Sequence, residues 1–345
     1  IGRQDGGTNQ VLATIKSKDD VPFLSAPLIF VSTLLTHLTG GSAGREGASI
    51  QFGGSIGNWL GKLAHLDEFD HHVMIMCGMS AAFAAVFGTP MAAAVFAMEV
   101  VSVGVMYYAA LLPCVIASII AAEFATGMGI DPETFPVHSI PGLTVETGLK
   151  MALIAVGCGI LSILFCILLK TVGQLYTKYL KNPYIRIVVA AGVIILLTIC
   201  LNTKDYMGAG SGLIARAIEK GEARPLDFLW KMLLTALTMR AGYRGGEIVP
   251  AFSIGATFGC VAGGILGFSP ELAAAASMVA LFCGVTNCPI TAMLISFELF
   301  GFSGAAYYLI AISISYAVSG YYSLYKDQTI VYSKYKARYI NRKTR

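Results

Sequence analysis

Long apolar runs, separated by short polar or glycine-rich stretches, dominate the chain. They cover approximately residues 22–41, 48–64, 73–126, 148–170, 185–201, 228–241, 248–268, 272–300 and 302–320. A membrane-spanning helix needs about 20 apolar residues, so the longest runs must hold more than one helix. Others, such as 228–241, are too short or too rich in glycine for a simple crossing, and broken helices are tolerated in a bilayer only where they are buried in protein or line a cavity. The pattern predicts an all-α polytopic membrane protein with broken helices.

The composition supports this class and limits the partners. Of the 345 residues, 56% are hydrophobic and 13% are charged, whereas soluble domains have roughly 25% charged residues. The net charge of +4 is too small to indicate a nucleic-acid partner. Basic residues gather in 334–345, and the positive-inside rule therefore predicts a cytoplasmic C-terminus.

The cysteines and the chain start predict little chemistry. All eight cysteines lie in apolar segments, form no CxxC and have no His or Asp at ligand spacing. We read them as small hydrophobic residues and expect neither a metal nor a cofactor. The chain opens on Ile1 without a signal peptide, so its start looks trimmed.

The stretch Gly44-Arg45-Glu46-Gly47 is the strongest candidate site. It places one carboxylate among glycines between two apolar runs, and an ionisable group at membrane depth is a functional hypothesis by default. The glycines let the backbone approach a ligand, and the free N–H groups of a following helix favour an anion. A carboxylate there can occupy the place of the anion and leave it on taking a proton, which predicts a proton-coupled anion gate.

Two halves of the chain resemble each other. In 88–99 and in 287–298, a Pro precedes a lone Glu by nine residues, at Pro90 and Glu99 and again at Pro289 and Glu298. Pro suits the first turn of each expected helix. The Ser-Ile-Gly triplets at 55–57 and 253–255 repeat at an offset of 198 residues, against 199 for the prolines.

A weaker third match joins 6–15 to 208–218. The second copy follows two hydrophobic segments that the first copy lacks, so we expect an opening helix or two to be missing from the first half. Internal repeats with interrupted helices are typical of secondary transporters, with the site at the repeat interface. The predicted parts are a first repeat at 1–126, a linker at 127–147, a second repeat at 148–320 and a C-terminal segment at 321–345.

These motifs together resemble the CLC family of chloride channels and anion/proton antiporters. The GREG stretch followed by 51–57 is similar to the GREGPxxQ(x)GxxxG signature of that family, and 245–250 stands where the family carries GxFxP. Tyr332, followed by Ser333, resembles the tyrosine whose hydroxyl meets the central anion. The resemblance covers essentially the whole chain.

The resemblance implies a fold and a set of site residues. The fold is a CLC-like pair of inverted-topology repeats with broken helices that meet at a central anion site, in a homodimer with one pathway per subunit. Glu46 would be the gate and proton carrier. Glu247 and Thr8 would contact the anion ligands without binding the anion themselves. The implied anion-binding positions are Gly44, Arg45, Gly47, Ile248, Val249, Tyr332 and Asn9.

The departures from the family pattern favour one branch. Ala48 replaces the proline after GREG, 6–9 replaces the serine-bearing loop, and Val100 stands where proton-coupled chloride members carry an inward glutamate. A chain that lacks the serine loop and the inward glutamate but keeps the gating glutamate resembles the bacterial fluoride/proton antiporters. Glu247 is similar to that branch as well. Val249 and Ser253 replace the Thr and Phe expected in that branch and favour chloride. We expect export of fluoride rather than chloride, in the inner membrane of a bacterium.

Several residues have a simpler reading as well. Glu46 could be an ion-pair partner of Arg45, although successive helical residues do not face each other. Glu99 and Glu298 end apolar helices, where structural hydrogen bonds are the favoured role. Asn9 could be a ligand or a turn residue, and Tyr332 is one of several tyrosines near the C-terminus. Arg240 could attract anions or lie in a cytoplasmic loop.

Three other functions remain to be weighed. A passive anion channel of the same fold would need the same backbone site but no proton, and the retained Glu46 argues against it. An intramembrane enzyme would need a nucleophile–base pair or a metal motif, and the chain has no HExxH and no paired intramembrane aspartates. A cation-coupled carrier would need more intramembrane Asp, Asn and Ser. The favoured partners are therefore halide anions, protons and the lipid bilayer.

Overall fold

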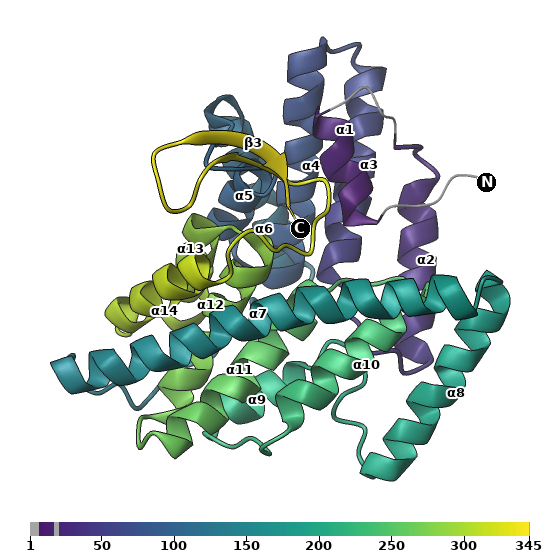
Figure 1. Cartoon of the computed structure of the whole chain (residues 1–345). Helices are drawn as coiled ribbons and strands as arrows, with labels where there is room; N and C mark the ends of the chain where they lie inside the picture. Colours follow the sequence, from purple (N-terminus) through teal and green to yellow (C-terminus); the bar gives the residue numbers. More distant parts are fainter. Residues whose placement is uncertain (1–6, 17–20, 345) are drawn as a thin grey trace.

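The structure is a computed structural model that describes residues 7–16 and 21–344. Figure 1 shows a bundle of helices of very different lengths with a small sheet at one side. The helices are α1 (Thr8–Lys16), α2 (Ser25–Leu38), α3 (Glu46–Leu63), α4 (Glu68–Phe87), α5 (Pro90–Glu99), α6 (Leu111–Gly127), α7 (Val145–Tyr179), α8 (Pro183–Leu201), α9 (Ser211–Glu219), α10 (Asp227–Ala241), α11 (Ile248–Ile265), α12 (Pro270–Thr286), α13 (Pro289–Phe300) and α14 (Ala305–Val318). A 3₁₀ turn, Tyr108–Ala110, leads into α6, and the strands are β1 (Ser102–Val103), β2 (Thr329–Tyr332) and β3 (Tyr339–Lys343).

The apolar runs become helices of two kinds. Among the described residues, five helices are long and apolar enough to cross a membrane: Glu68–Phe87, Tyr108–Gly127, Val145–Tyr179, Pro183–Leu201 and Ile248–Ile265. The other apolar helices, among them α5 and α13, are shorter. The longest runs, 73–126 and 272–300, each hold more than one helix, as predicted. The protein is thus an integral membrane protein with broken helices.

Two helix pairs, α3 with α4 and α11 with α12, have the same packing. A Cβ on Gly57 would lie 2.5 Å from the carbonyl oxygen of Met74, and one on Gly255 would lie 2.5 Å from that of Ser277. Gly53 and Gly259 are equally tight against the backbone of Gly78 and Ala273. Only glycine allows the paired backbones to come this close.

The two halves match at an offset that differs from the predicted one. Glycines stand at positions 8, 12 and 16 of both helices: Gly53, Gly57 and Gly61 in α3, and Gly255, Gly259 and Gly263 in α11. The offset between these helices is therefore 202 residues, and the 198-residue match of the Ser-Ile-Gly triplets is wrong by one helical turn. A glycine pattern that repeats every four residues matches itself when it is shifted by four, which explains the error.

The short helices α5 and α13 exchange end contacts. The Glu99 carboxylate, at the end of α5, accepts hydrogen bonds from the backbone N–H groups of Ile290 (3.1 Å) and Thr291 (2.8 Å) at the start of α13. The Glu298 carboxylate accepts from Met91 and Ala92 at the start of α5, both at 2.9 Å. Both carboxylates therefore cap a helix N-terminus, which confirms their structural role. Such reciprocal contacts are those of two halves related by a two-fold axis, and they confirm the inverted repeat.

The third predicted match also has a structural counterpart. Both α1 and α9 follow a glycine with positive φ, Gly7 at 63° and Gly210 at 92°. In the first half α1 packs on α3 and α4, and in the second half α9 packs on α11 and α12. Gly6, the first residue of that predicted match, lies outside the described residues.

The C-terminal segment is not helical and adds a small sheet to the mostly helical fold. After α14 the chain forms β2 and β3, and β2 pairs in parallel with β1, directly after α5. Ile330 points inward and is fully buried. The sheet therefore ties the C-terminal residues to the first half of the molecule.

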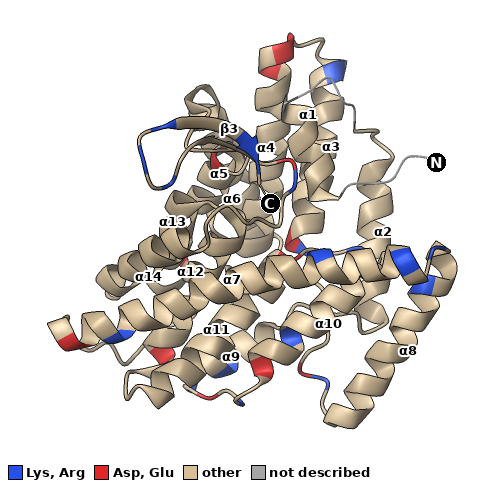
Figure 2. Ribbon diagram, in the orientation of Figure 1, with Lys and Arg blue, Asp and Glu red and all other residues tan. Residues whose placement is uncertain are grey.

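The charged residues lie mostly at the periphery. Figure 2 shows Lys, Arg, Asp and Glu mainly at helix ends, in loops and in the C-terminal strands. The long helix α7 crosses α10, α11, α12 and α14 (Figure 1) and covers one side of the second half. Fully buried charges inside this apolar bundle are therefore few, and each needs an explanation.

Candidate anion site

The N-termini of α3 and α11 meet at a pair of glycines. The N–H of Gly44 donates to the carbonyl of Gly246 at 2.8 Å, and the N–H of Gly246 donates to the carbonyl of Gly44 at 2.6 Å. This short antiparallel bridge joins the GREG stretch to residues 245–250, and the two bridged glycines are 202 residues apart in the chain. It brings two helix N-termini, with their free N–H groups, to the same place, where they favour an anion.

Glycine is required at this bridge. A Cβ on Gly47 would lie 2.8 Å from the Cα of Gly246, and a Cβ on Gly246 would run into the backbone of Gly47. A Cβ on Gly44 would run into the Glu46 carboxylate and would lie 3.0 Å from Pro250. The glycines were expected to let the backbone approach a ligand. In the structure they also let the two halves approach each other.

Glu46 is the first residue of α3 and is only 2% exposed. Its carboxylate lies beside the backbone N–H groups of Arg45 and Glu46 itself, at the helix N-terminus. Among the described residues, its Oε2 atom is buried and has no hydrogen-bond partner. A buried carboxylate oxygen without a partner is costly, so this carboxylate is only partly satisfied at the helix N-terminus.

Arg45 contacts Glu46 only loosely. Its Nε lies 3.7 Å from Oε1 of Glu46, whereas its Nη2 lies 3.1 Å from Oε1 of Glu133. The Arg45 side chain is 55% exposed. The expectation that these neighbours do not face each other is therefore wrong, but Glu133 is the stronger partner of Arg45.

Glu247 occupies the matching place before α11. It is the N-cap residue of that helix, and its Oε1 lies 3.7 Å from Nη2 of Arg240. Ile248 and Val249 follow in the first turn, and both are almost completely buried. The structure therefore brings Gly44, Arg45, Glu46, Gly47, Glu247, Ile248 and Val249 together around one point.

Thr8 and Asn9, at the start of α1, make different contacts. The Thr8 hydroxyl donates to the carbonyl of Gly47 at 3.1 Å, so Thr8 supports the first turn of α3. The Asn9 side-chain oxygen accepts from the backbone N–H of Asp327 at 3.5 Å. Asn9 thus contacts the turn that follows α14, and its role as an anion ligand stays a prediction.

Tyr332 lies at the end of a surface strand, and its role as an anion ligand stays a prediction. It ends β2, is 47% exposed and stacks edge-on against Tyr339 at a centroid distance of 5.8 Å. Tyr325 is only 2% exposed and lies within electrostatic reach of Glu247. Tyr325 also lies closer than Tyr332 to the end of α14, so it is the better candidate for the tyrosine of the site.

At the position after Glu99, the backbone carbonyl accepts a hydrogen bond from a buried side-chain amide. Val100 is fully buried, and its carbonyl accepts from the Gln328 side chain at 3.0 Å. The same Gln328 nitrogen donates to Thr286, and its oxygen accepts from Asn287 and Ser323. No carboxylate takes the place of the inward glutamate here.

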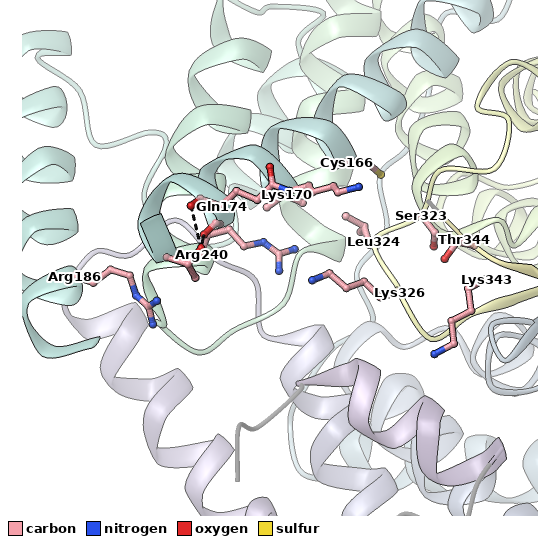
Figure 3. Close-up of a pocket in the computed structure, with 13 residues that line it drawn as sticks. Cys166, Lys170, Gln174, Arg186, Arg240, Ser323, Leu324, Lys326, Lys343 and Thr344 are labelled. Atoms are coloured by element: carbon pink, nitrogen blue, oxygen red, sulfur yellow. Dashed lines mark hydrogen bonds between the residues drawn. The ribbon is translucent and has the colours of Figure 1, made fainter. Parts of the chain in front are cut away.

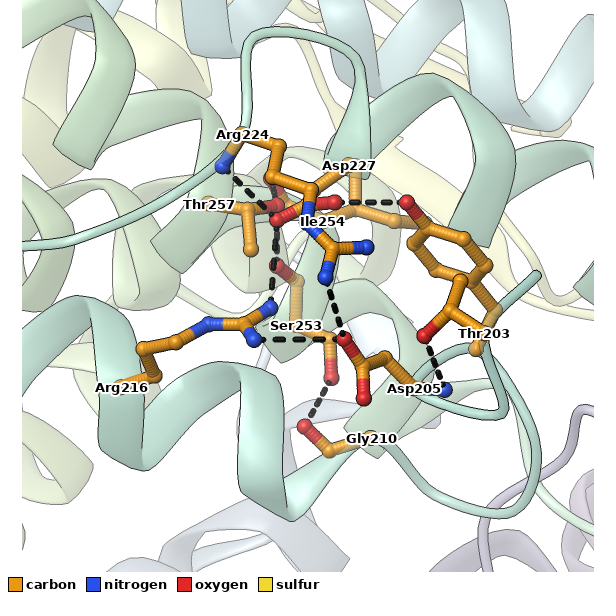
Figure 4. Close-up of polar contacts among 10 residues, drawn as sticks. Thr203, Asp205, Gly210, Arg216, Arg224, Asp227, Ser253, Ile254 and Thr257 are labelled. Carbon is orange, nitrogen blue, oxygen red and sulfur yellow. Dashed lines mark hydrogen bonds and ion pairs between the residues drawn. The ribbon is translucent and has the colours of Figure 1, made fainter. Parts of the chain in front are cut away.

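Sequence reasoning missed Lys231 and the structural contacts of Ser253. Lys231 lies in α10 and is fully buried, and a lone lysine inside an apolar run was the available signal. Ser253 donates to the carbonyls of Ala209 (3.2 Å) and Gly210 (3.0 Å), as Figure 4 shows for Gly210. Ser253 therefore holds the α8–α9 loop, and its expected effect on anion selectivity stays a prediction.

A basic cavity of about 590 Å³ opens near the C-terminal segment. Figure 3 shows that its cations come from several elements: Lys170, Arg186, Arg240, Lys326 and Lys343. The hydrogen bond with Asp327, 2.8 Å long, raises the pKa of Lys343, which therefore stays charged at neutral pH. Arg240 lines this cavity and also pairs with Glu247, so it connects the cavity to the glycine bridge.

Comparisons with known proteins agree with this geometry. The family model described as "Voltage gated chloride channel" matches residues 2–320. The "Chloride/fluoride channel protein" of Pseudomonas syringae pv. tomato is 33% identical over 341 residues, which are 96% of this chain and 75% of that protein. The "H(+)/Cl(-) exchange transporter ClcA" of Vibrio cholerae serotype O1 is 28% identical over 272 residues, and this chain spans only 58% of it.

Solved structures match as well. A CLC-type fluoride/proton antiporter superposes with a TM-score of 0.90 at 34% identity, covering 93% of this chain and 82% of that one. A slow cyanobacterial Cl⁻/H⁺ antiporter superposes with a TM-score of 0.76 at 18% identity, covering 91% and 76%, and it shows the fold alone. These relatives are transporters, exchangers or channels by name, and none is an enzyme.

Proposed function

This chain belongs to the voltage-gated chloride channel family, and we propose that it is a halide/proton antiporter with Glu46 as its gate. The observation that carries the proposal is the Glu46 carboxylate itself. It is almost fully buried at the N-terminus of α3, beside the bridge to α11, and one of its oxygens has no partner among the described residues.

The exchange follows from the competition between two anions for one place. An ionised Glu46 occupies the N-terminus of α3 and excludes a halide ion. When Glu46 takes a proton, its attraction to the helix N-terminus falls, and a halide can bind the freed backbone donors. The donors that we assign are near Gly44, Arg45, Gly47, Ile248 and Val249. Each turnover then moves the halide and the proton in opposite directions.

Fluoride is the preferred substrate in this proposal. Fluoride is small and strongly hydrated, so its site must replace water with close, strong donors. The first turns of α1 and α3 offer backbone N–H groups without a serine ligand, and Tyr325 adds a buried hydroxyl. Two relatives above 30% identity carry fluoride in their names. Val249 has no hydroxyl and is the feature that argues for chloride.

The oligomeric state, membrane and orientation of the protein belong to the same proposal. We place it as a homodimer in the inner membrane of a bacterium, with the C-terminal strands in the cytoplasm. The basic residues of 334–345 support this orientation, and the dimer follows from the family resemblance. No enzymatic step is part of the proposal.

Reconstituted protein tests the proposal. Liposomes loaded with fluoride or chloride are diluted into halide-free buffer, and halide efflux and internal pH are recorded together. We expect fluoride efflux faster than chloride efflux, with proton uptake that stops when the halide gradient is absent. Efflux without proton movement would instead indicate the passive channel, and a fluoride-to-chloride ratio at or below one would indicate a chloride transporter.

A further inference from the structure

Lys231 is a fully buried cation in the middle of α10. Its ammonium donates to the Ser42 hydroxyl at 3.0 Å and to the carbonyls of Tyr206 (3.1 Å) and Gly208 (2.7 Å). The three N–H bonds of the ammonium thus have three acceptors. All three acceptors are neutral, so hydrogen bonding is satisfied but the charge is not balanced.

The nearest acidic residue on the same helix is committed elsewhere. Asp227, one turn before Lys231, accepts from the Tyr206 hydroxyl at 2.6 Å and from the backbone N–H of Arg224 at 2.9 Å (Figure 4). It also pairs with Arg216 at 3.4 Å. Within the described part of the chain, no carboxylate is in contact with Lys231. A buried charge without a counterion is rare, so this one calls for a functional reason.

Lys231 is tied to the loop that carries the gate. Ser42 stands two residues before Gly44, and its hydroxyl also contacts that of Thr235 at 3.0 Å. Its backbone N–H donates to Thr238 at 3.1 Å. Ser42 thus places Lys231 beside the GREG stretch, and at this depth little water screens its charge.

Other charged or titratable groups also act on Glu46. Arg45 lies 3.7 Å from it and Glu133 binds Arg45. His37, on α2, lies close to Gly44, Arg45 and Lys231. On the α11 side, Glu247 is paired with Arg240. Glu133 and Glu247 thus each have an arginine partner, whereas no carboxylate of the described residues contacts Lys231.

We propose that Lys231 is a positioning residue that supplies a fixed positive charge to the site, attracts the halide and keeps Glu46 ionised in its blocking position. The antiport part rests on the proposed function, whereas the halide-attracting part does not. Lys231 has no N–H left for a direct bond to the anion, so it acts through its field. A carboxylate that loses such a neighbour takes up its proton more readily.

The first test is the pH profile of halide efflux. Lys231→Met keeps the length of the side chain and removes its charge, and we expect the midpoint of the profile to move to higher pH by about one unit. Lys231→Arg should restore the wild-type midpoint. Ser42→Ala is the matched control, because it weakens the same contact but leaves the charge, and its midpoint should stay unchanged. Lys231→Gln, which keeps a donor for the carbonyls, replaces Lys231→Met if that variant does not fold.

The second test does not depend on proton coupling. Fluoride binding is measured by calorimetry in Glu46→Gln protein, with and without Lys231→Met. We expect about tenfold weaker binding when Lys231 is removed. An unchanged midpoint and unchanged affinity in a folded variant would overturn the proposal, and so would a shift in Ser42→Ala as large as that in Lys231→Met. Absence of proton movement in the wild type would overturn only the proposed function, and the binding test would still decide about Lys231.

Discussion

The two halves of this protein share one scaffold and differ in charge at its centre. Each half packs a glycine-lined helix, α3 or α11, against its neighbour, and each ends a short helix with a glutamate that caps the other half. In the matched register Arg45 corresponds to Glu247, and Glu46 corresponds to Ile248.

The two halves share a fold but carry different charged residues at their matched helix N-termini. Arg45 pairs with Glu133 and Glu247 pairs with Arg240, so the two N-cap positions carry ion pairs of opposite sense. Only the first half places a carboxylate at the first position of its helix. The scaffold therefore brings two helix N-termini together, and in our proposal only the first half supplies the group that blocks the site and carries a proton.

The glycine bridge, common to both halves, should be the most sensitive point. Gly246→Ala puts a Cβ into the backbone of Gly47, and overpacking of this kind costs about 1–3 kcal/mol. We expect loss of halide efflux together with a lowered thermal unfolding temperature in detergent. Gly264→Ala is the control in α11, because a Cβ there meets nothing within 4 Å. Wild-type efflux and stability in Gly246→Ala would contradict the bridge.

The two capping glutamates should behave alike. Glu99→Gln and Glu298→Gln each weaken charge-assisted hydrogen bonds to a helix N-terminus, and we expect each to lower the free energy of unfolding by about 1–2 kcal/mol. Thermal unfolding in detergent measures the loss, and proton uptake per halide measures coupling, which should stay unchanged. If Glu99→Gln lost coupling while Glu298→Gln kept it, the symmetric structural role would be refuted.

The sequence reveals those features that local chemistry determines. The lone carboxylate of the GREG stretch, the glycines and the two capping glutamates could be recognised because each has a local physical requirement. The register of α3 against α11 could not be fixed, because a four-residue glycine repeat fits at several shifts. It follows only from the bridge between Gly44 and Gly246, a contact across the fold.

Long-range packing also explains what the sequence left open. Tyr325 and Tyr332 both follow the last helix, and only the pairing of β2 with β3 shows that Tyr332 faces outward. The strands themselves are short and depend on β1, more than 200 residues earlier. Lys231 was visible as a lysine in an apolar run, but its three acceptors belong to two other loops.

The choice between the two tyrosines predicts a smaller effect. Tyr325→Phe removes a buried hydroxyl that we propose lies at the site, and we expect fluoride binding to weaken about five- to tenfold, as for one lost hydrogen bond to a charged group. Tyr332→Phe, at the half-exposed position, should bind fluoride as the wild type does. Calorimetric titration of both variants measures this, and the opposite ranking would favour Tyr332 as the tyrosine of the site.

The most direct test of the central claim is proton transport by Glu46→Gln protein in liposomes. The side chain of this variant keeps its size but can no longer alternate between a charged and a neutral form. A halide gradient is imposed and internal pH is followed, with wild-type protein measured in parallel. We predict that halide efflux continues, because the backbone donors of α3 and α11 remain, and that no protons move against it. Proton uptake driven by the halide gradient in Glu46→Gln would contradict the assignment of Glu46 as the gate.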